Sequence, residues 1–301
     1  MFCIVGADGF FGGYIQRLLL SRQEEVLAFN HRQPVFPSHP LVKNCPFELA
    51  DKESLDAAEK LLRQYRDIKI IYLAAAHNPD FVKADPAGAM RINRELYSEF
   101  LKKISLCDIT ELWYSSSDTV YGESTGGTVF TEDMPLSPIN VYGEQKAEAE
   151  RVTLENGFSV ARFSYMFAPS LSAKRHFFDK ITDDLRAGKE IVMFSDYVRS
   201  SLDYPTAAEY LVRLINTKTD KKIVNICADN PTSKYDIGLI AAEYCGADRA
   251  LVVPALSDST GVFTEKRAKE LVMSNKLLRS IVNETGVIKA GNNFHRQFPE
   301  E

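Results

Sequence analysis

The sequence predicts an α/β fold: a doubly wound parallel sheet of the Rossmann type, with a smaller substrate-binding lobe interleaved in its C-terminal half. Two observations carry this prediction. Short apolar runs alternate with amphipathic stretches from the first residue onward, which is typical of parallel strands joined by crossover helices. Three glycines spaced three apart, Gly6, Gly9 and Gly12, stand between the first apolar run and the first amphipathic stretch.

The expected strands and helices alternate regularly through the first half of the chain. Apolar runs predict strands at MFCIV, VLAF, KIIYLAA, TELWYSS and FSVARFS. Amphipathic segments predict helices in GGYIQRLLLSRQ, in a periodic stretch that ends near Ile104, and in NVYGEQKAEAERVTLENG.

This alternation breaks after Ser164. A helix is expected around Phe177 to Arg186, followed by the strand IVMF, the helix TAAEYLVRLI and the strand IVNIC, and these last three elements can rejoin the sheet. The dinucleotide-binding domain is therefore predicted as residues 1–164 plus about 192–228. The substrate-binding lobe is predicted as about 165–191 plus 229–301.

Composition excludes several classes of protein. The formal net charge is -5, so the chain has no basic field to hold nucleic acid or an anionic membrane. The longest strongly apolar stretch, Ile70 to Ala76, is far shorter than the roughly 20 residues that a bilayer requires. A cytoplasmic protein is expected. The histidines His31, His39, His77 and His295 have no metal-ligand spacing, so no metal is expected.

The glycine loop predicts a dinucleotide site. After a strand and before a helix, the first glycine permits a tight turn, the second lets the backbone approach a pyrophosphate, and the third allows close packing of the helix. The phosphates would then lie at the helix N-terminus, beside Phe10 and Phe11, where free N–H groups and the helix dipole favour negative charge.

The end of the second predicted strand bears on the choice between NADP and NAD. An acidic residue is expected there when the ribose 2′-hydroxyl is bound, but this strand ends Asn30-His31-Arg32. A guanidinium and an imidazole suit a 2′-phosphate, so NADP is favoured over NAD. The alternative is that Arg32 stacks on adenine or lies in solvent.

Tyr142 and Lys146 predict an acid/base pair. Four residues apart, they would share one face of a helix that opens near Asn140. A Lys ammonium close to a phenol favours the phenolate, which a free Tyr with a pKa of about 10 does not form near neutral pH. Tyr65 and Lys69 have the same spacing, but no hydroxyl cluster precedes that pair.

Several stretches resemble the extended short-chain dehydrogenase/reductases, the nucleotide-sugar epimerases, dehydratases and ketoreductases. The G-x-x-G-x-x-G loop, YSSSDTVYG, TEDMPLSPINVYGEQK and RFSYMFAP carry this resemblance, with YLAAAHNPD and RINREL as further landmarks. The resemblance covers most of residues 1–215.

The resemblance implies a role for each matching residue. Ser117 would hydrogen-bond the reacting oxygen, Tyr142 would be the acid/base, and Lys146 would bind the nicotinamide ribose. Arg162 would be a framework residue. Beyond the glycine loop, the expected cofactor contacts are Asn30, His31, Arg32, Glu48, Leu49, Leu73, Ala74, Ala75, Asn93, Ser115, Tyr142 and Lys146.

The resemblance also narrows the reaction. A 4,6-dehydratase carries an Asp-Glu pair after the catalytic hydroxyl, and here Asp118 is followed by Thr119. An epimerase and a 4-ketoreductase both stay open. The substrate would be a nucleotide-sugar, and its expected contacts are His77, Asp118, Lys174, Arg175, His176 and Arg199.

A second class of function stays open. Some proteins of this fold bind a dinucleotide without turnover and act as regulators or associate with RNA. The intact Ser, Tyr and Lys set favours the enzyme, and the acidic net charge disfavours RNA. The sequence leaves a homodimer open.

Overall fold

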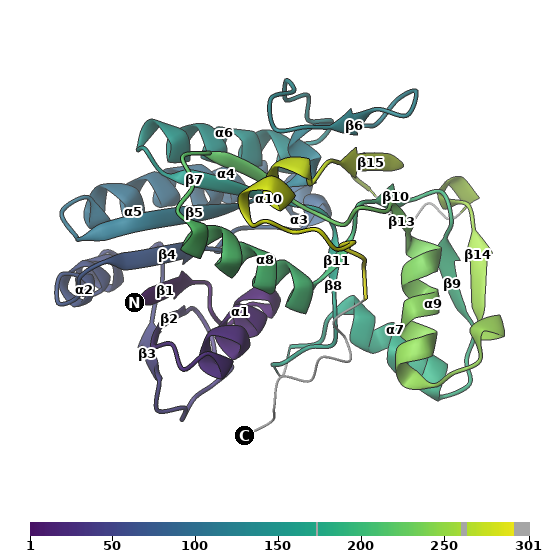
Figure 1. The fold of residues 1–301 in the computed structure, drawn as a ribbon, viewed down its shortest axis with the longest axis horizontal. Coiled ribbons are helices and arrows are strands. Elements are labelled where there is room, and N and C mark those ends of the chain that lie inside the picture. The colour runs from purple at the N-terminus through teal and green to yellow at the C-terminus, as the bar shows by residue number, and fades with distance from the viewer. Residues whose placement is uncertain (173, 260–263, 292–301) are drawn as a thin grey trace.

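The computed structural model describes residues 1–172, 174–259 and 264–291. Its centre is a seven-stranded parallel sheet in the order β3-β2-β1-β4-β5-β7-β12. The chain runs outward from the middle to one edge and then returns to build the other half, so the predicted doubly wound fold is confirmed (Figure 1). The strands are β1 (Phe2–Val5), β2 (Val26–Asn30), β3 (Val42–Pro46), β4 (Ile68–Tyr72), β5 (Ile109–Ser117), β7 (Ser159–Phe163) and β12 (Ile223–Ile226).

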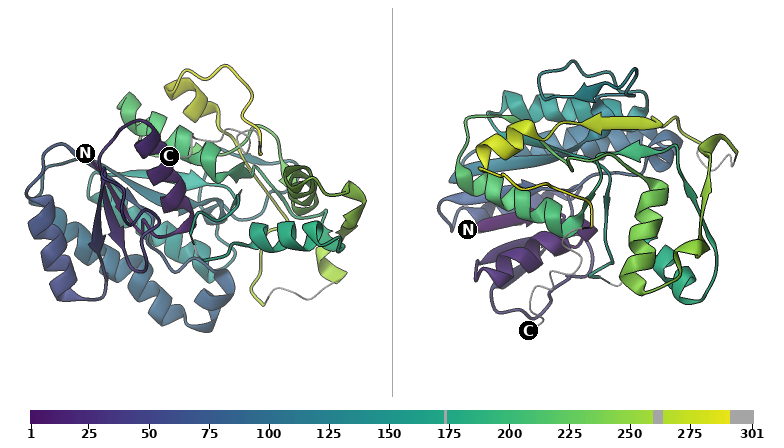
Figure 2. Two further views of the ribbon diagram at one scale, coloured as in Figure 1. Left: turned by 90° about the horizontal axis from the view of Figure 1, so that it is seen from below. Right: turned by 45° about the vertical axis from the view of Figure 1, so that its right-hand side comes forward.

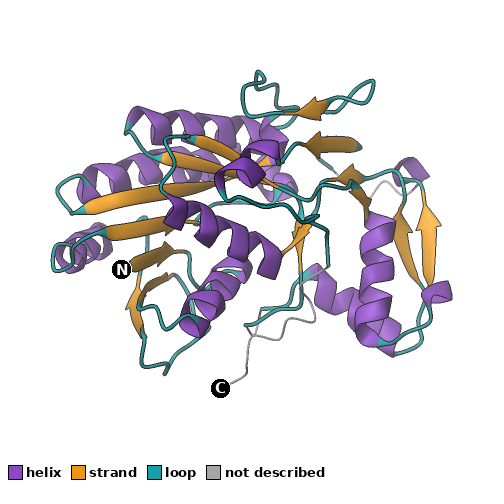
Figure 3. Ribbon diagram, in the orientation of Figure 1, coloured by secondary structure: helices purple, strands orange, loops and turns teal. Residues whose placement is uncertain are grey.

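Helices cover both faces of this sheet, as Figures 2 and 3 show from different sides. One apolar cluster packs α1 (Phe10–Ser21), α8 (Tyr204–Thr217) and α10 (Lys276–Ile281) against one face. A second cluster packs α2 (Lys52–Leu62), α5 (Tyr97–Ile104) and α6 (Val141–Glu155) against the other. Strands buried on both faces read as continuous apolar runs, which is why these segments lack a two-residue alternation.

The first loop after β4 has its own short elements. They are the helices α3 (Pro79–Ala84) and α4 (Pro86–Met90) and a π-helical turn, η1 (Arg91–Leu96), that leads into α5. The 3-10 turn η2 (Asp118–Val120) follows β5. π-helical turns occur frequently at functional sites, and η1 carries Asn93.

The smaller lobe lies beyond the carboxyl ends of the strands, at the right of Figure 1. Its helices α7 (Phe177–Arg186) and α9 (Lys234–Cys245) pack on a two-stranded sheet of β9 (Ile191–Phe194) and β14 (Val252–Ala255). The remaining short elements are β6 (Val129–Phe130), β8 (Met166–Phe167), β10 (Val198–Arg199), β11 (Leu202–Asp203), β13 (Thr232–Ser233), β15 (Glu270–Met273), η3 (Arg249–Leu251) and η4 (Ser257–Ser259).

One expectation about this region is wrong. The strand IVMF does not rejoin the main sheet but pairs with β14 as β9, whereas IVNIC does rejoin it as β12 beside β7. The two runs look alike in sequence. IVMF lies outside the main sheet because its partner is β14, which follows residue 251. The division into two domains stays a prediction, and residues 260–263 and 292–301 of the predicted lobe, with His295, lie outside the described residues. In the part of the chain that the structure describes, no helix has the length and apolar character to cross a bilayer.

Candidate active site

The glycine loop turns tightly between β1 and α1. Gly6 has φ +87°, which L side chains rarely adopt, and its N–H donates to the Phe29 carbonyl at the end of β2 (3.0 Å). A Cβ on Gly12 would lie 2.6 Å from the Gly6 carbonyl oxygen, so the helix can approach the loop only because this residue has no side chain. Gln16 on α1, buried beneath the loop, donates to the Ala7 carbonyl (2.8 Å).

This loop fits a pyrophosphate. Helix α1 begins after Gly9 and no described side chain caps it, so the N–H groups of Phe10 and Phe11 are available to an anion. Gly6 lies against Ala74 at the end of β4, where a Cβ would be 3.1 Å from the Ala74 nitrogen. The loop therefore lies at the point where the strand order reverses, which is where open α/β sheets bind their ligands.

At the end of β2, carboxylates surround the residues expected to favour NADP. Asp8, inside the glycine loop, accepts hydrogen bonds from the backbone N–H groups of His31 and Arg32, both at 3.1 Å. The His31 Nε2 lies 2.9 Å from a carboxylate oxygen of Glu48. Asn30 is buried, and Arg32 is exposed. The preference for NADP stays a prediction.

Loop residues after β4 are tied to α6 through Asn93. Its side chain accepts from the Ala76 N–H (2.7 Å) and donates to the Ala76 carbonyl (3.1 Å) and to Gln145 (2.9 Å). These contacts hold the backbone that follows Leu73, Ala74 and Ala75 against the helix. Asn93 thus fixes the position of expected cofactor contacts.

Ser117 ends β5, and Tyr142 and Lys146 stand in the first two turns of α6. Asn140 caps α6 by accepting from the Gly143 N–H (2.8 Å), which places Tyr142 in the first turn and Lys146 one turn later. A Cβ on Gly143 would lie 2.6 Å from the Thr119 carbonyl oxygen, so a glycine here lets the helix approach the strand end.

Tyr142 is set as a proton donor. Its side chain is buried and hydrogen-bonded with Ser117. Burial, and then the negative charge of Asp118, raises the pKa of Tyr142 above its ordinary value, and the hydrogen bond with Ser117 offsets only part of this. Ser117 itself donates to Asp118 (3.1 Å).

Lys146, one turn further along α6, has an unusually low affinity for its proton. Its ammonium donates to the Ser115 carbonyl (2.7 Å) and to the Tyr114 hydroxyl (3.0 Å). Burial lowers the pKa of Lys146 to about 7, although Glu150 raises it in part. Tyr65, the alternative acid/base, is in a turn after α2, where Lys43 lies over its ring.

A buried ion pair anchors this constellation. Arg162 on β7 lies 2.6 Å from Glu150 on α6, and both side chains are only 2% exposed. Ser116 on β5 donates to the same carboxylate (2.5 Å), and Arg162 also donates to the Tyr121 hydroxyl (2.7 Å). The framework role that the resemblance implies for Arg162 agrees with these contacts.

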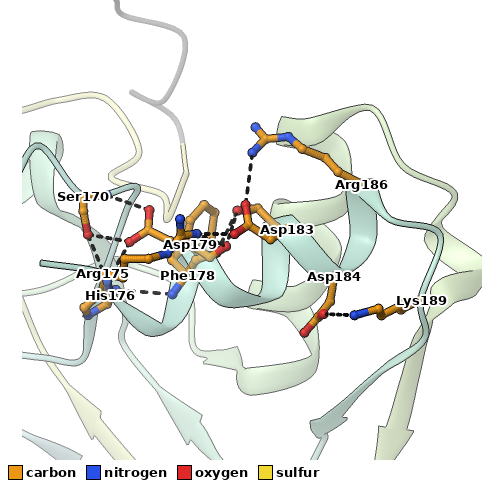
Figure 4. A network of polar contacts seen from close by, with 10 residues as sticks. Ser170, Arg175, His176, Phe178, Asp179, Asp183, Asp184, Arg186 and Lys189 are labelled. Carbon is orange, nitrogen blue, oxygen red and sulfur yellow. Dashed lines mark hydrogen bonds and ion pairs between the residues drawn. The ribbon is translucent and has the colours of Figure 1, made fainter. Parts of the chain in front are cut away.

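The lobe residues expected to bind substrate differ in their surroundings. His176 caps α7 by accepting from the Phe178 N–H (3.5 Å), as Figure 4 shows, and its ring lies against Phe10 of the glycine loop (centroids 4.7 Å apart). Arg175 pairs with Asp183 on the outer side of α7 (Figure 4). These contacts favour structural roles for both residues.

Arg199 is also largely engaged within the protein. Its guanidinium donates to the backbone carbonyls of Val198 (2.7 Å), Ala268 (2.5 Å) and Lys269 (3.0 Å), and its Nε lies 3.7 Å from Asp118. Asp118 is buried beside Ser117, and burial raises its pKa while Arg199 lowers it.

Other cations complete the lobe side of the site. Exposed Lys174 lies over the ring of Phe10 (5.1 Å). Desolvation, and then the positive charge of Lys174, lowers the pKa of His77. The Lys234 ammonium lies over the ring of Tyr165 (2.7 Å), and Arg267 pairs with Asp80 (2.5 Å).

Sequence reasoning missed Asp8, Gln16, Lys234 and Arg267. Asp8 is visible in the sequence as an acid between the first two glycines, but its contact with the end of β2 is not, and no sequence signal marks Lys234 or Arg267. Among the described residues, no group of three or more His, Cys, Asp and Glu side chains has the arrangement of a metal site.

Comparisons with known proteins identify the family of this chain. The family model described as RmlD substrate binding domain matches residues 1–286. Methionine adenosyltransferase 2 subunit beta from Xenopus laevis is 26% identical over 267 residues, 86% of this chain and 76% of that protein. The protein of the same name from Rattus norvegicus is 30% identical over 115 residues, and the match spans 38% of this chain and about a third (34%) of that protein.

Solved structures share the fold. The dTDP-4-dehydrorhamnose reductase from Bacillus anthracis in complex with NADP superposes with a TM-score of 0.79 at 17% identity, covering 99% of this chain and 97% of that one. The UDP-glucose 4-epimerase from Thermus thermophilus in complex with NAD gives 0.75 at 18% identity, covering 93% and 92%. Because the RmlD substrate binding domain model spans nearly the whole chain, this protein belongs to that family, among the extended short-chain dehydrogenase/reductases.

Proposed function

We propose that this protein is an NAD(P)-dependent oxidoreductase or epimerase that transfers hydride at a sugar carbon of a nucleotide-sugar, as a 4-ketoreductase or a 4-epimerase. The observation that supports the proposal is that Ser117 ends β5 and that α6, which carries Tyr142 and Lys146, packs on this strand, where Lys146 donates to the Ser115 carbonyl (2.7 Å). The family supports an enzyme of this general kind.

Each of these side chains has a distinct task in a reduction. A bound reduced dinucleotide supplies the hydride that forms the new C–H bond at the carbonyl carbon. The Tyr142 hydroxyl gives its proton to the carbonyl oxygen, which forms the O–H bond and leaves a phenolate. Ser117 donates a hydrogen bond to the same oxygen, and Lys146 stabilises the phenolate by its charge. In an epimerase the same groups also run the step in reverse.

The surroundings of Tyr142 support the reducing direction. A phenol whose pKa is raised by burial keeps its proton at neutral pH and so begins as the donor. Lys174, whose ammonium lies over the Phe10 ring at the glycine loop, supports a substrate that carries a diphosphate, whereas burial lowers the pKa of Lys234 and favours its neutral form.

The test is a panel of nucleotide-sugars and their 4-keto forms, assayed with both dinucleotides. Tyr142→Phe should keep dinucleotide binding and lose turnover by about 10² to 10⁴, the usual contribution of general acid catalysis. Tyr65→Phe is the matched control, since it removes a phenol that also stands four residues before a lysine and should leave the rate unchanged. Near-normal turnover by Tyr142→Phe would make the catalytic assignment wrong.

A second function is favoured by one specific observation, the 26% identity to a protein named as a subunit of methionine adenosyltransferase. A regulatory subunit would bind a dinucleotide and turn over no sugar. Binding of NADH or NADPH without oxidation by any member of the panel would support this alternative.

A further inference from the structure

The glycine loop carries an acid into the place where the two nicotinamide dinucleotides differ. Asp8 stands between Gly6 and Gly9, and each of its carboxylate oxygens accepts one backbone hydrogen bond at the end of β2, from His31 and from Arg32 (3.1 Å each). The Gly6 and Ala7 N–H groups donate to the Phe29 carbonyl (3.0 and 3.1 Å), so the loop and the strand end are fixed together.

A second carboxylate stands beside the first. Glu48 follows β3, and one of its oxygens lies 2.9 Å from the His31 Nε2 while the other accepts from the Ala50 N–H (3.0 Å). The imidazole and the two backbone N–H groups, which could bind a phosphate, therefore already have carboxylate partners. Arg32 adds one exposed positive charge against the two negative charges of Asp8 and Glu48.

The two cofactors differ at the adenosine ribose. NAD presents a 2′-hydroxyl, which can donate a hydrogen bond to a carboxylate. NADP presents a 2′-phosphate with up to two negative charges, which accepts hydrogen bonds and is repelled by a carboxylate. A phosphate would have to displace Asp8 from the His31 and Arg32 amides before it could use them.

We propose that Asp8 selects NAD over NADP. In other dinucleotide folds an acid at the end of the second strand binds the ribose 2′-hydroxyl, and here Asp8 does so from the glycine loop. The proposal rests on the proposed function only in requiring that a dinucleotide binds at this loop. It runs against the expectation drawn from Arg32, because the two carboxylates outnumber that cation and one of them occupies the backbone donors.

Binding of NAD⁺ and NADP⁺ to the full chain, measured by calorimetry without substrate, tests the proposal. The wild type should bind NAD⁺ at least tenfold more tightly. Asp8→Asn keeps the size of the side chain and one acceptor oxygen but removes the charge. It should therefore lower the ratio of NAD⁺ affinity to NADP⁺ affinity about tenfold, mainly by tightening the binding of NADP⁺. Asp8→Ser is a second variant that removes the charge with a smaller side chain, in case Asp8→Asn disturbs the loop.

Glu24→Gln is the matched control, because Glu24 is exposed just before β2 at the opposite end of the strand and its loss changes the net charge equally. It should leave the ratio unchanged. Competition by ADP-ribose and by adenosine 2′,5′-bisphosphate reports the ribose site without the nicotinamide, and ADP-ribose should compete better against the wild type.

The outcomes separate the two proposals. Tighter binding of NADP⁺ by the wild type, with a loss confined to NADP⁺ in Arg32→Ala, would overturn the role of Asp8 and leave the proposed function intact. An unchanged ratio in both Asp8 variants would overturn it as well. Failure of the wild type to bind either dinucleotide would overturn the proposed function and this inference with it.

Discussion

At the scale of single residues, Gly9 and Gly12 of the glycine loop are needed for two different reasons. Gly12 is required by the protein itself, because a Cβ there would lie within 2.8 Å of three backbone atoms of Gly6 and Ala7. Gly9 has φ -75°, and a Cβ there would meet only the Gly6 carbonyl oxygen at 3.2 Å, so the fold demands much less of it. Its requirement comes from the ligand.

Gly9→Val should therefore fold and lose dinucleotide binding, whereas Gly12→Val should lose stability as well. A valine at position 9 would stand where a pyrophosphate must approach the backbone, and a valine at position 12 would separate α1 from the loop. Thermal melts and dinucleotide titrations of the two variants give the comparison. Unchanged dinucleotide affinity in Gly9→Val would remove the cofactor site from this loop.

Lys146 is buried at a cost in folding stability that can be measured. Its pKa is about 7 in the folded protein, against 10.5 for an unperturbed lysine, so between these values the unfolded chain binds more protons and stability rises with pH. Below pH 7 the folded protein bears the whole cost of a buried ammonium. Lys146→Met should thus be more stable than the wild type at pH 6 without cofactor, and this advantage should shrink from pH 7 to pH 10.

Denaturant unfolding across this pH range, with exposed Lys102→Met as the control, measures the effect. The control should show no such trend. An advantage of Lys146→Met that did not change with pH would mean that the ammonium is not desolvated in the folded protein.

At the scale of elements, helix α6, which carries the proposed acid/base, is fixed by polar contacts rather than by apolar packing alone. The Glu150–Arg162 pair joins α6 to β7, and Ser116 joins the same carboxylate to β5. These are the elements that carry the proposed acid/base and the reacting-oxygen donor. A buried pair of this kind holds a geometry, while its net contribution to stability is small.

Arg162→Met should destabilise the fold by about 3–5 kcal/mol, because it leaves Glu150 charged, buried and without its partner. The double variant Glu150→Met/Arg162→Met should recover much of this loss, since no buried charge then remains. Urea unfolding of the wild type, Arg162→Met and the double variant measures the loss and its recovery. A double variant less stable than Arg162→Met would show that the pair stabilises the fold outright.

At the scale of the whole molecule, α3 joins the sheet domain to the lobe. Asp80 accepts hydrogen bonds from the Thr264 N–H (3.2 Å), the Thr264 hydroxyl (2.8 Å) and the Glu265 N–H (3.0 Å), and it pairs with Arg267 (2.5 Å). Lys83 donates to the Thr264 carbonyl (2.6 Å). One carboxylate thus holds the lobe loop beside the site.

Asp80→Ala should raise the KM for a nucleotide-sugar about tenfold, equivalent to about 1.4 kcal/mol, with little change in kcat or in dinucleotide affinity. The reason is that the predicted lobe loses one of its contacts with α3 while the glycine loop keeps all its contacts. Asp56→Ala is the control, because Asp56 pairs with Lys103 between α2 and α5, away from the lobe. A parallel loss of dinucleotide affinity would indicate that Asp80 supports the whole fold.

The sequence by itself predicted the doubly wound parallel sheet, the glycine loop and the Ser117, Tyr142 and Lys146 set. The sheet is confirmed, and the roles of the loop and of the three side chains stay predictions. Each of these depends on short-range rules: an apolar run makes a buried strand, three glycines permit one turn, and two residues four apart share a helix face. The context of the strand end also favours Tyr142 over Tyr65, and this choice stays a prediction.

Only the tertiary structure decided which residues at the strand ends lie together. Asp8 is more than 20 positions from His31, and Asp80 is more than 180 from Arg267, so no local pattern links either pair. The same holds for β9, whose partner strand follows it by about 60 residues. Charges that meet across such separations are placed by packing of the layers, and this is why the sequence predicts the tight turn of the glycine loop but does not reveal the contacts that Asp8 makes from it.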